Sequence, residues 1–125
     1  MNVSRMIDAE SGLVTFTVTG KVTRTGIIEE LGRMLGDPDF RKGASNLWDF
    51  RSADGSGVTS ADIQQLAIFI EKNRDRRGDG YKVAFVVARE ADFGMARVYE
   101  GYAASLPFDI RVFRRMEEAL AWIRT

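Results

Sequence analysis

The stretch Asn46–Leu66, NLWDFRSADGSGVTSADIQQL, contains an apolar segment, a loop and a helix start in direct succession. Its first part, Asn46–Arg51, has the short apolar character of a buried strand, and Ser52–Val58 is a loop rich in glycine and serine. Thr59 is followed three residues later by Asp62, which matches a capping box and predicts that a helix begins here. In an open α/β sheet, loops between strand ends and helix N-termini are where ligands and partners usually bind.

The residues before this stretch predict a hairpin followed by a helix. Val3–Asp8 and Leu13–Thr19 have the composition of strands, and the short turn between them favours antiparallel pairing. In the second of these strands apolar residues alternate with threonine, which indicates one buried face and one more polar face. Apolar residues at helical spacing predict a helix over Arg24–Leu35, and Gly36 is well placed to end it.

The residues after it continue the alternation of strands and helices. The helix that begins at Thr59 is predicted to run to about Arg76, and Tyr81–Arg89 is the next strand. Because residues 83–88 of that strand are apolar without interruption, it is expected to be an interior parallel strand covered on both faces. A third helix opens at residue 91 or 92, Phe108–Arg114 is the last strand, and Met116–Arg124 is the last helix.

The predicted fold is therefore α/β, in the order β-β-α-β-α-β-α-β-α. Strands that alternate with helices form mostly parallel sheets, and the hairpin adds one antiparallel strand. We expect one domain over residues 1–125, with a mostly parallel five-stranded sheet and an antiparallel N-terminal edge strand.

The composition narrows the function. Lys+Arg and Asp+Glu both number 18, so the formal net charge is zero, which argues against a nucleic-acid binder or a protein that binds anionic membranes. Cysteine and histidine are absent, which removes thiol nucleophiles, Ser-His-Asp triads and zinc sites with the usual ligands. We expect a non-enzymatic protein without metal or cofactor. No signal peptide or apolar run of about 20 residues is visible, so a cytoplasmic location without membrane insertion is expected.

Three groups of residues carry a resemblance to a known family. They are Leu47-Trp48-Asp49-Phe50-Arg51, Phe93-Gly94-Met95-Ala96-Arg97, and the C-terminal run from Val112-Phe113-Arg114 through Glu118-Ala119-Leu120-Ala121-Trp122-Ile123. With the order of elements, they resemble the STAS family of bacterial anti-sigma-factor antagonists. The resemblance is closest to small STAS-like bacterial proteins that are often grouped with CRAL-TRIO-like lipid carriers, and it covers nearly the whole chain.

The resemblance implies a regulatory domain that binds a protein partner, such as an anti-sigma factor or a kinase. Classical antagonists carry an Asp-Ser-Ser-Gly segment before the second helix, and a partner kinase phosphorylates a serine in it. The matching segment here is Asp54-Gly55-Ser56-Gly57, which places Ser56 on the phosphorylated position and Gly55 on that of the first serine. The oligomeric state is left open.

The residues of this loop also suggest a binding site independently of the family resemblance. Ser56, Thr59 and Ser60, together with Asp54, surround a predicted helix N-terminus, where unpaired N–H groups and the helix dipole favour an anion or a partner. The alternative is an ordinary helix cap within a flexible loop. Thr59 is the expected cap, which leaves Ser56 as the freer hydroxyl. Asp54 and Asp49 together could bind Mg²⁺ or perform acid–base chemistry, but a structural role for Asp49 is favoured.

A second candidate site is a small apolar pocket. Trp48, Phe93, Tyr99 and Tyr102 supply aromatic surface, and Arg97 is positioned to orient an acidic ligand or to pair with a nearby glutamate. The alternative is that these aromatic residues are plain core. A pocket would suit a carrier or sensor of a small apolar or lipid-like ligand, which is the second functional hypothesis.

Basic residues gather at the end of the second predicted helix: Lys72, Arg74, Arg76 and Arg77. Cations near a helix C-terminus interact favourably with the helix dipole. The cluster is therefore predicted to be a solvated helix end, followed by a turn over residues 77–79.

Overall fold

The computed structural model describes residues 1–125. Its elements follow one another as β1 (Asn2–Ile7), β2 (Val14–Lys21), α1 (Arg24–Leu35), β3 (Asn46–Asp54), α2 (Ser60–Lys72), α3 (Arg74–Arg77), β4 (Lys82–Val86), α4 (Glu90–Ala103), β5 (Asp109–Phe113) and α5 (Met116–Ile123). None of the helices is both long enough and apolar enough to cross a bilayer.

The five strands form one sheet in the order β1-β2-β3-β4-β5. β1 lies at one edge and pairs antiparallel with β2, and all the other neighbours are parallel. β4 lies between β3 and β5, so it is an interior strand. The predicted fold class, the antiparallel edge strand and the interior position of β4 are confirmed.

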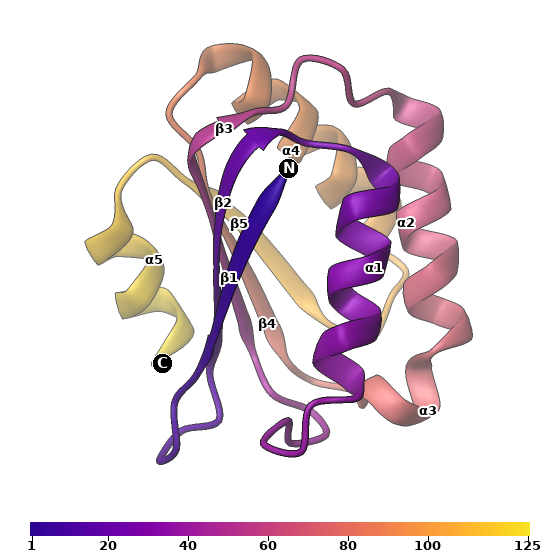
Figure 1. Ribbon diagram of the computed structural model, residues 1–125, viewed down its shortest axis with the longest axis vertical. Coiled ribbons are helices and arrows are strands. Elements are labelled where there is room, and N and C mark those ends of the chain that lie inside the picture. The colour runs from indigo at the N-terminus through magenta and orange to yellow at the C-terminus, as the bar shows by residue number, and fades with distance from the viewer.

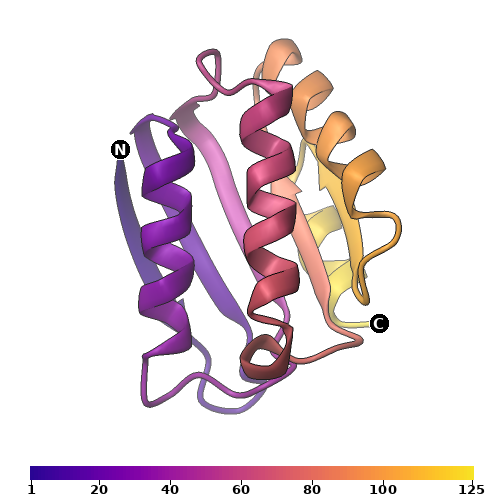
Figure 2. The ribbon, with the colours of Figure 1, turned by 90° about the vertical axis from the view of Figure 1, so that its right-hand side faces the viewer.

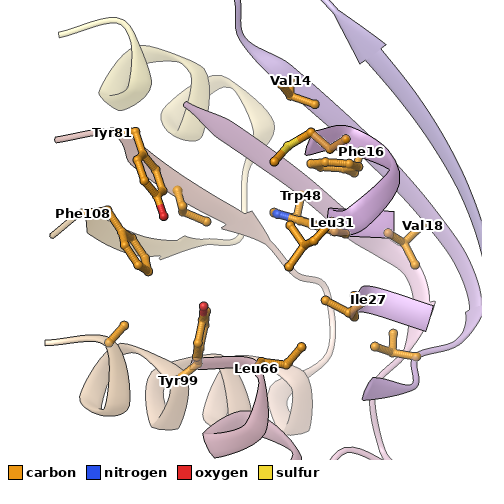
Figure 3. Close-up of a cluster of buried hydrophobic side chains, with 14 of the residues drawn as sticks. Val14, Phe16, Val18, Ile27, Leu31, Trp48, Leu66, Tyr81, Tyr99 and Phe108 are labelled. Carbon is orange, nitrogen blue, oxygen red and sulfur yellow. The ribbon is translucent and has the colours of Figure 1, made fainter. Parts of the chain in front are cut away.

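The helices cover the two faces of the sheet unequally. α1, α2 and α4 stand side by side on one face, and α5 lies alone on the other (Figures 1 and 2). The face under the three helices therefore holds most of the buried side chains, in a cluster that extends from β2 to the residues before β5 (Figure 3).

Strand alternation assigns the side chains of β4 to these two layers. Ala84 and Val86 are fully buried with Ala119 of α5, whereas Val83 belongs to the cluster under the three helices and Phe85 packs against that cluster. Both faces of β4 are therefore covered, which explains its uninterrupted apolar sequence.

Aromatic rings run across the face under the three helices. Phe16 of β2 stacks on Trp48 of β3, with 3.9 Å between ring centroids, and Trp48 is followed by Phe50 at 5.7 Å. Phe85 of β4 continues the series, and its ring stacks with Tyr99 of α4 at 5.6 Å. These rings tie three strands and one helix into a continuous layer.

The strand predicted over Tyr81–Arg89 is shorter, at Lys82–Val86, and two further boundaries that differ from the prediction are those of α2 and β3. The helix predicted to run to Arg76 is interrupted at Asn73, whose Nδ2 donates to the carbonyl of Phe69 at 2.8 Å. A side-chain amide that bonds locally to the backbone competes with regular helix hydrogen bonds, and α2 ends there. β3 continues three residues beyond the predicted strand, because Lys21 at the end of β2 pairs with Asp54.

We expect Phe16→Ala to lower the free energy of unfolding by about 3–5 kcal/mol, because Phe16 is fully buried and stacks on Trp48. Urea denaturation followed by circular dichroism measures this change. Met6→Ala is the control: its side chain is 73% exposed, and a change within about 0.5 kcal/mol is expected. Similar effects for the two variants would contradict the packing described.

Candidate functional site

The loop between β3 and α2 lies at the carboxyl edge of the parallel strands and is fixed at both ends. At its start, the backbone N–H of Ser56 donates to Oδ1 of Asp54 at 2.9 Å. The backbone N–H of Gly55 donates to Oδ1 of Asp92, on α4, at 3.1 Å. Asp92 is 8% exposed, so the loop is joined to the neighbouring helix by a buried carboxylate.

At the end of the loop, Thr59 caps α2 as predicted. Its hydroxyl accepts from the N–H of Asp62 at 3.1 Å, and the Asp62 carboxylate accepts from the N–H of Thr59 at 3.0 Å. This reciprocal capping box is worth about 1 kcal/mol and occupies the Thr59 side chain. Ser56 and Ser60 are exposed, so their side chains remain accessible.

Asp54 is held in its charged form. Hydrogen bonds from Ser56, followed by the Arg89 guanidinium, lower the pKa of the Asp54 carboxyl to about 2. Its pKa in the folded chain is below the ordinary value of 3.8, so the stabilisation is complete above pH 4 and is lost as the pH falls towards 2. At neutral pH the loop therefore begins with a carboxylate that forms an ion pair with Arg89.

Gly55 is required by the close approach of Asp92. A Cβ atom at this position would lie 2.6 Å from Oδ1 of Asp92, which is shorter than any tolerable contact. The absence of a side chain here therefore permits the hydrogen bond between loop and helix. This accounts physically for glycine at position 55.

The surface continues from the loop along α2. Ile63 and Leu66 are buried towards the sheet, whereas Gln64, Gln65 and Ile68 face solvent. Ile68 is 41% exposed and is one of the few large apolar side chains at the surface. Loop and helix together present polar groups around one exposed apolar side chain.

A cavity of about 130 Å³ lies between the sheet and helices α1, α2 and α4. Of the aromatic residues predicted to form a pocket, Trp48 and Tyr99 line it. The other predicted pocket residues are absent from its lining. Phe93 packs under the Arg114 guanidinium at 4.5 Å, Arg97 is 3.7 Å from a carboxylate oxygen of Glu100, and Tyr102 is 41% exposed.

Arg77 is buried and lines this cavity, so its prediction as part of a solvated helix end is wrong. The residue is 5% exposed, and its guanidinium carbon lies 3.5 Å from the centroid of the Tyr81 ring. Neither Nη1 nor Nη2 has a hydrogen-bond partner, and Arg77 takes part in no ion pair. The cause is the helix break at Asn73, which begins the short turn of α3 and directs its last residue inwards. Arg74, by contrast, pairs with Asp79 at the surface.

The chain does not fully compensate the free-energy cost of burying the charge of Arg77. Burial lowers the pKa of Arg77 to about 10, so the side chain remains charged at neutral pH. Burying an unpaired ion costs several kcal/mol, and a desolvated cation–π contact offsets about 2 kcal/mol or more of this cost. The Oδ1 atom of Asn46, at the start of β3, is also buried without a partner and lines the same cavity.

Two tyrosines complete the polar end of the cavity. Figure 3 shows the phenol oxygens of Tyr81 and Tyr99 directed into the space between the sheet and α4. Burial raises the pKa of Tyr81 to about 12 and raises that of Tyr99 further, so both hydroxyls keep their protons at neutral pH. No sequence signal pointed to Arg77 or Asn46, because the helix break that places Arg77 was not predicted.

Acidic side chains do not gather into a metal site. No group of three or more acidic, histidine or cysteine side chains has the geometry to hold a metal ion. Asp49 accepts from the backbone N–H of Arg51 at 3.1 Å and from its Nε at 2.9 Å, which is the structural role favoured above.

Proteins similar to this chain are found by comparing structures and not by comparing sequences. No protein-family model matches the sequence, and no curated protein is significantly similar to it. A protein of the DUF3478 family with a SpoIIAA-like fold, from Shewanella loihica PV-4, superposes with a TM-score of 0.59 at 18% identity, over 98% of this chain and 92% of the other. The chain has a SpoIIAA-like fold.

An anti-sigma factor antagonist from Mycobacterium paratuberculosis has the same fold. It superposes with a TM-score of 0.60 at 15% identity, over 99% of this chain and 96% of the other. The fold expected from the sequence is confirmed by both structures, because each superposition extends over nearly the whole chain.

We expect Gly55→Ala to lower the free energy of unfolding by about 1–3 kcal/mol, because the added methyl group would overlap Asp92. Gly57→Ala is the matched control. Its added Cβ would meet only the flexible end of Lys21, at 2.9 Å, so a change within about 1 kcal/mol is expected. Thermal denaturation of both variants measures the difference, and equal stabilities would refute the close approach of loop and α4.

Proposed function

We propose that this protein is a non-enzymatic regulatory domain that binds a protein partner through residues 52–70, the loop after β3 and helix α2. The observation that carries this proposal is an exposed loop that is nevertheless held in one conformation. Hydrogen bonds from Gly55 and Ser56 fix its start, and the Thr59 capping box fixes its end. Preorganisation of this kind lowers the entropic cost of binding.

The proposal includes regulation by phosphorylation of Ser56. Its side chain is exposed at the carboxyl edge of the sheet, near the N-terminus of α2. A phosphate adds between one and two negative charges, which the helix dipole tolerates within the domain. A partner in contact with the loop would have to desolvate this charge. The likeness to an anti-sigma factor antagonist supports a regulatory role of this kind.

The second candidate is a carrier or sensor of a small apolar ligand. It is favoured by the cavity under α1, α2 and α4, whose lining is mostly apolar and aromatic. The cavity and the 52–70 surface involve different residues for the most part, so the two candidates can be tested separately.

Single-site crosslinking tests whether the loop contacts a partner. Because the chain has no cysteine, Ser56→Cys and Ser105→Cys each provide one attachment point for a thiol-linked photo-crosslinker. Ser105 is also exposed but follows α4, at the opposite edge of the sheet. In a lysate of the cell that makes the protein, we expect a discrete protein adduct from Ser56→Cys and none from Ser105→Cys. Identical adduct patterns would count against the loop as the binding surface.

We expect Ser56→Asp to shift the melting temperature by no more than a few degrees and to weaken binding of the crosslinked partner at least tenfold, or roughly 1.4 kcal/mol. Ser56→Ala should bind like wild type and should lose any phosphorylation by a cognate kinase. Ser105→Asp makes the same change of charge away from the loop and should leave affinity unchanged. If Ser56→Asp binds like wild type, regulation at this serine is wrong.

A further inference from the structure

The cavity under the three helices has a polar end and an apolar body. Arg77, Asn46, Tyr81 and Tyr99 line one part of it, near the amino ends of β3 and β4. Apolar side chains from α1, α2 and α4 line most of the rest, among them Leu31, Leu66 and Met95, and Asp92 lines it beside the 52–70 loop. An elongated small molecule with one polar group would match this division.

The polar end lacks a negative charge. The terminal nitrogens of Arg77 have no hydrogen-bond partner, although the residue is only 5% exposed. The groups facing the guanidinium are neutral rings: Tyr81 at 3.5 Å and Phe40 at 5.6 Å. Arginine is normally buried only with an anion, because its fork of N–H donors requires acceptors. Nothing in the chain supplies them.

We propose that the cavity binds a small monocarboxylate, with its carboxylate on Arg77 and its apolar body between the sheet and helices α1, α2 and α4. The two Nη atoms can donate to the two carboxylate oxygens, the geometry in which arginine binds carboxylates best. The hydroxyls of Tyr81 and Tyr99 keep their protons and can donate to the same group. Binding satisfies a cation that the folded chain leaves unpaired.

Charge and size define the ligand class further. One buried cation balances one negative charge, so a carboxylate fits and a doubly charged phosphate monoester would leave a net charge buried. The cavity volume of about 130 Å³ is close to the roughly 150 Å³ of an engineered apolar cavity that binds benzene. The whole ligand, its carboxylate included, is therefore little larger than one aromatic ring. This site deepens the carrier or sensor candidate and does not depend on the 52–70 surface.

Isothermal titration calorimetry with phenylacetate and its uncharged counterpart 2-phenylethanol tests the proposal on the wild-type protein. We expect phenylacetate to bind with a dissociation constant below about 1 mM and at least tenfold more tightly than 2-phenylethanol. Binding of neither compound would overturn the carrier or sensor candidate together with this proposal. Equal binding of both compounds would be consistent with a carrier of neutral ligands and would overturn the proposed carboxylate site. Tighter binding of phenyl phosphate would overturn the assignment of a single negative charge.

Two variants test whether Arg77 is the residue that binds the carboxylate of phenylacetate. We expect Arg77→Met to weaken phenylacetate binding at least tenfold while 2-phenylethanol binding changes less than threefold. Arg76→Met removes the same charge from the exposed neighbour and should bind phenylacetate like wild type. Equal losses in the two variants would overturn the role of Arg77. The wild-type comparison needs no variant, so the proposal remains testable even if Arg77→Met does not fold.

Discussion

The aromatic layer across the sheet determines how closely the helices can approach it. Phe16 and Trp48 stack at 3.9 Å with an interplanar angle of 16°, and Phe85 stacks with Tyr99 to join the sheet to α4. Rigid rings fill a layer only where neighbouring shapes match, and they cannot adjust to irregular gaps as methionine does. We infer that this layer supports α1, α2 and α4 above the strands and leaves the cavity between them.

The polar end of the cavity and the exposed loop of the 52–70 surface lie at opposite ends of the same strand. β3 starts at Asn46, beside the cavity, and ends at Asp54, where the 52–70 surface begins. Eight residue steps of about 3.3 Å place the two ends roughly 25 Å apart. The Asp92 carboxylate also connects the two regions, because it accepts from Gly55 in the loop and lines the cavity from α4. A ligand that moves α4 would therefore act on the loop through a direct hydrogen bond.

Local signals in the sequence predicted the fold and part of the loop. Alternation in the hairpin, the unbroken apolar run of β4 and the capping box at Thr59 each depend on near neighbours, and all are confirmed. The contacts that shape the sites are between distant residues. The approach of Asp92 to Gly55 joins positions 37 residues apart, and no local pattern signals it.

The burial of Arg77 also could not be predicted from local sequence patterns. A basic run at a helix end is normally solvated, and only the break at Asn73 turns one of its four members into the core. Composition also offered no help, because a net charge of zero says nothing about where a single cation lies. Tyr102 illustrates the converse: the pocket hypothesis grouped it with Tyr99, but Tyr99 is buried and Tyr102 is 41% exposed.

The burial of a charged, unpaired guanidinium is the feature on which the ligand site depends, and side-chain NMR observes it directly. Spectra of the arginine Nε and Nη groups at neutral pH, with Arg77→Met to assign the signal, report both protonation and exchange with water. We expect Arg77 to be protonated, to exchange much more slowly than exposed Arg76, and to show nuclear Overhauser contacts with the Tyr81 ring. Equally fast exchange for both arginines, without contacts to Tyr81, would contradict a buried cation.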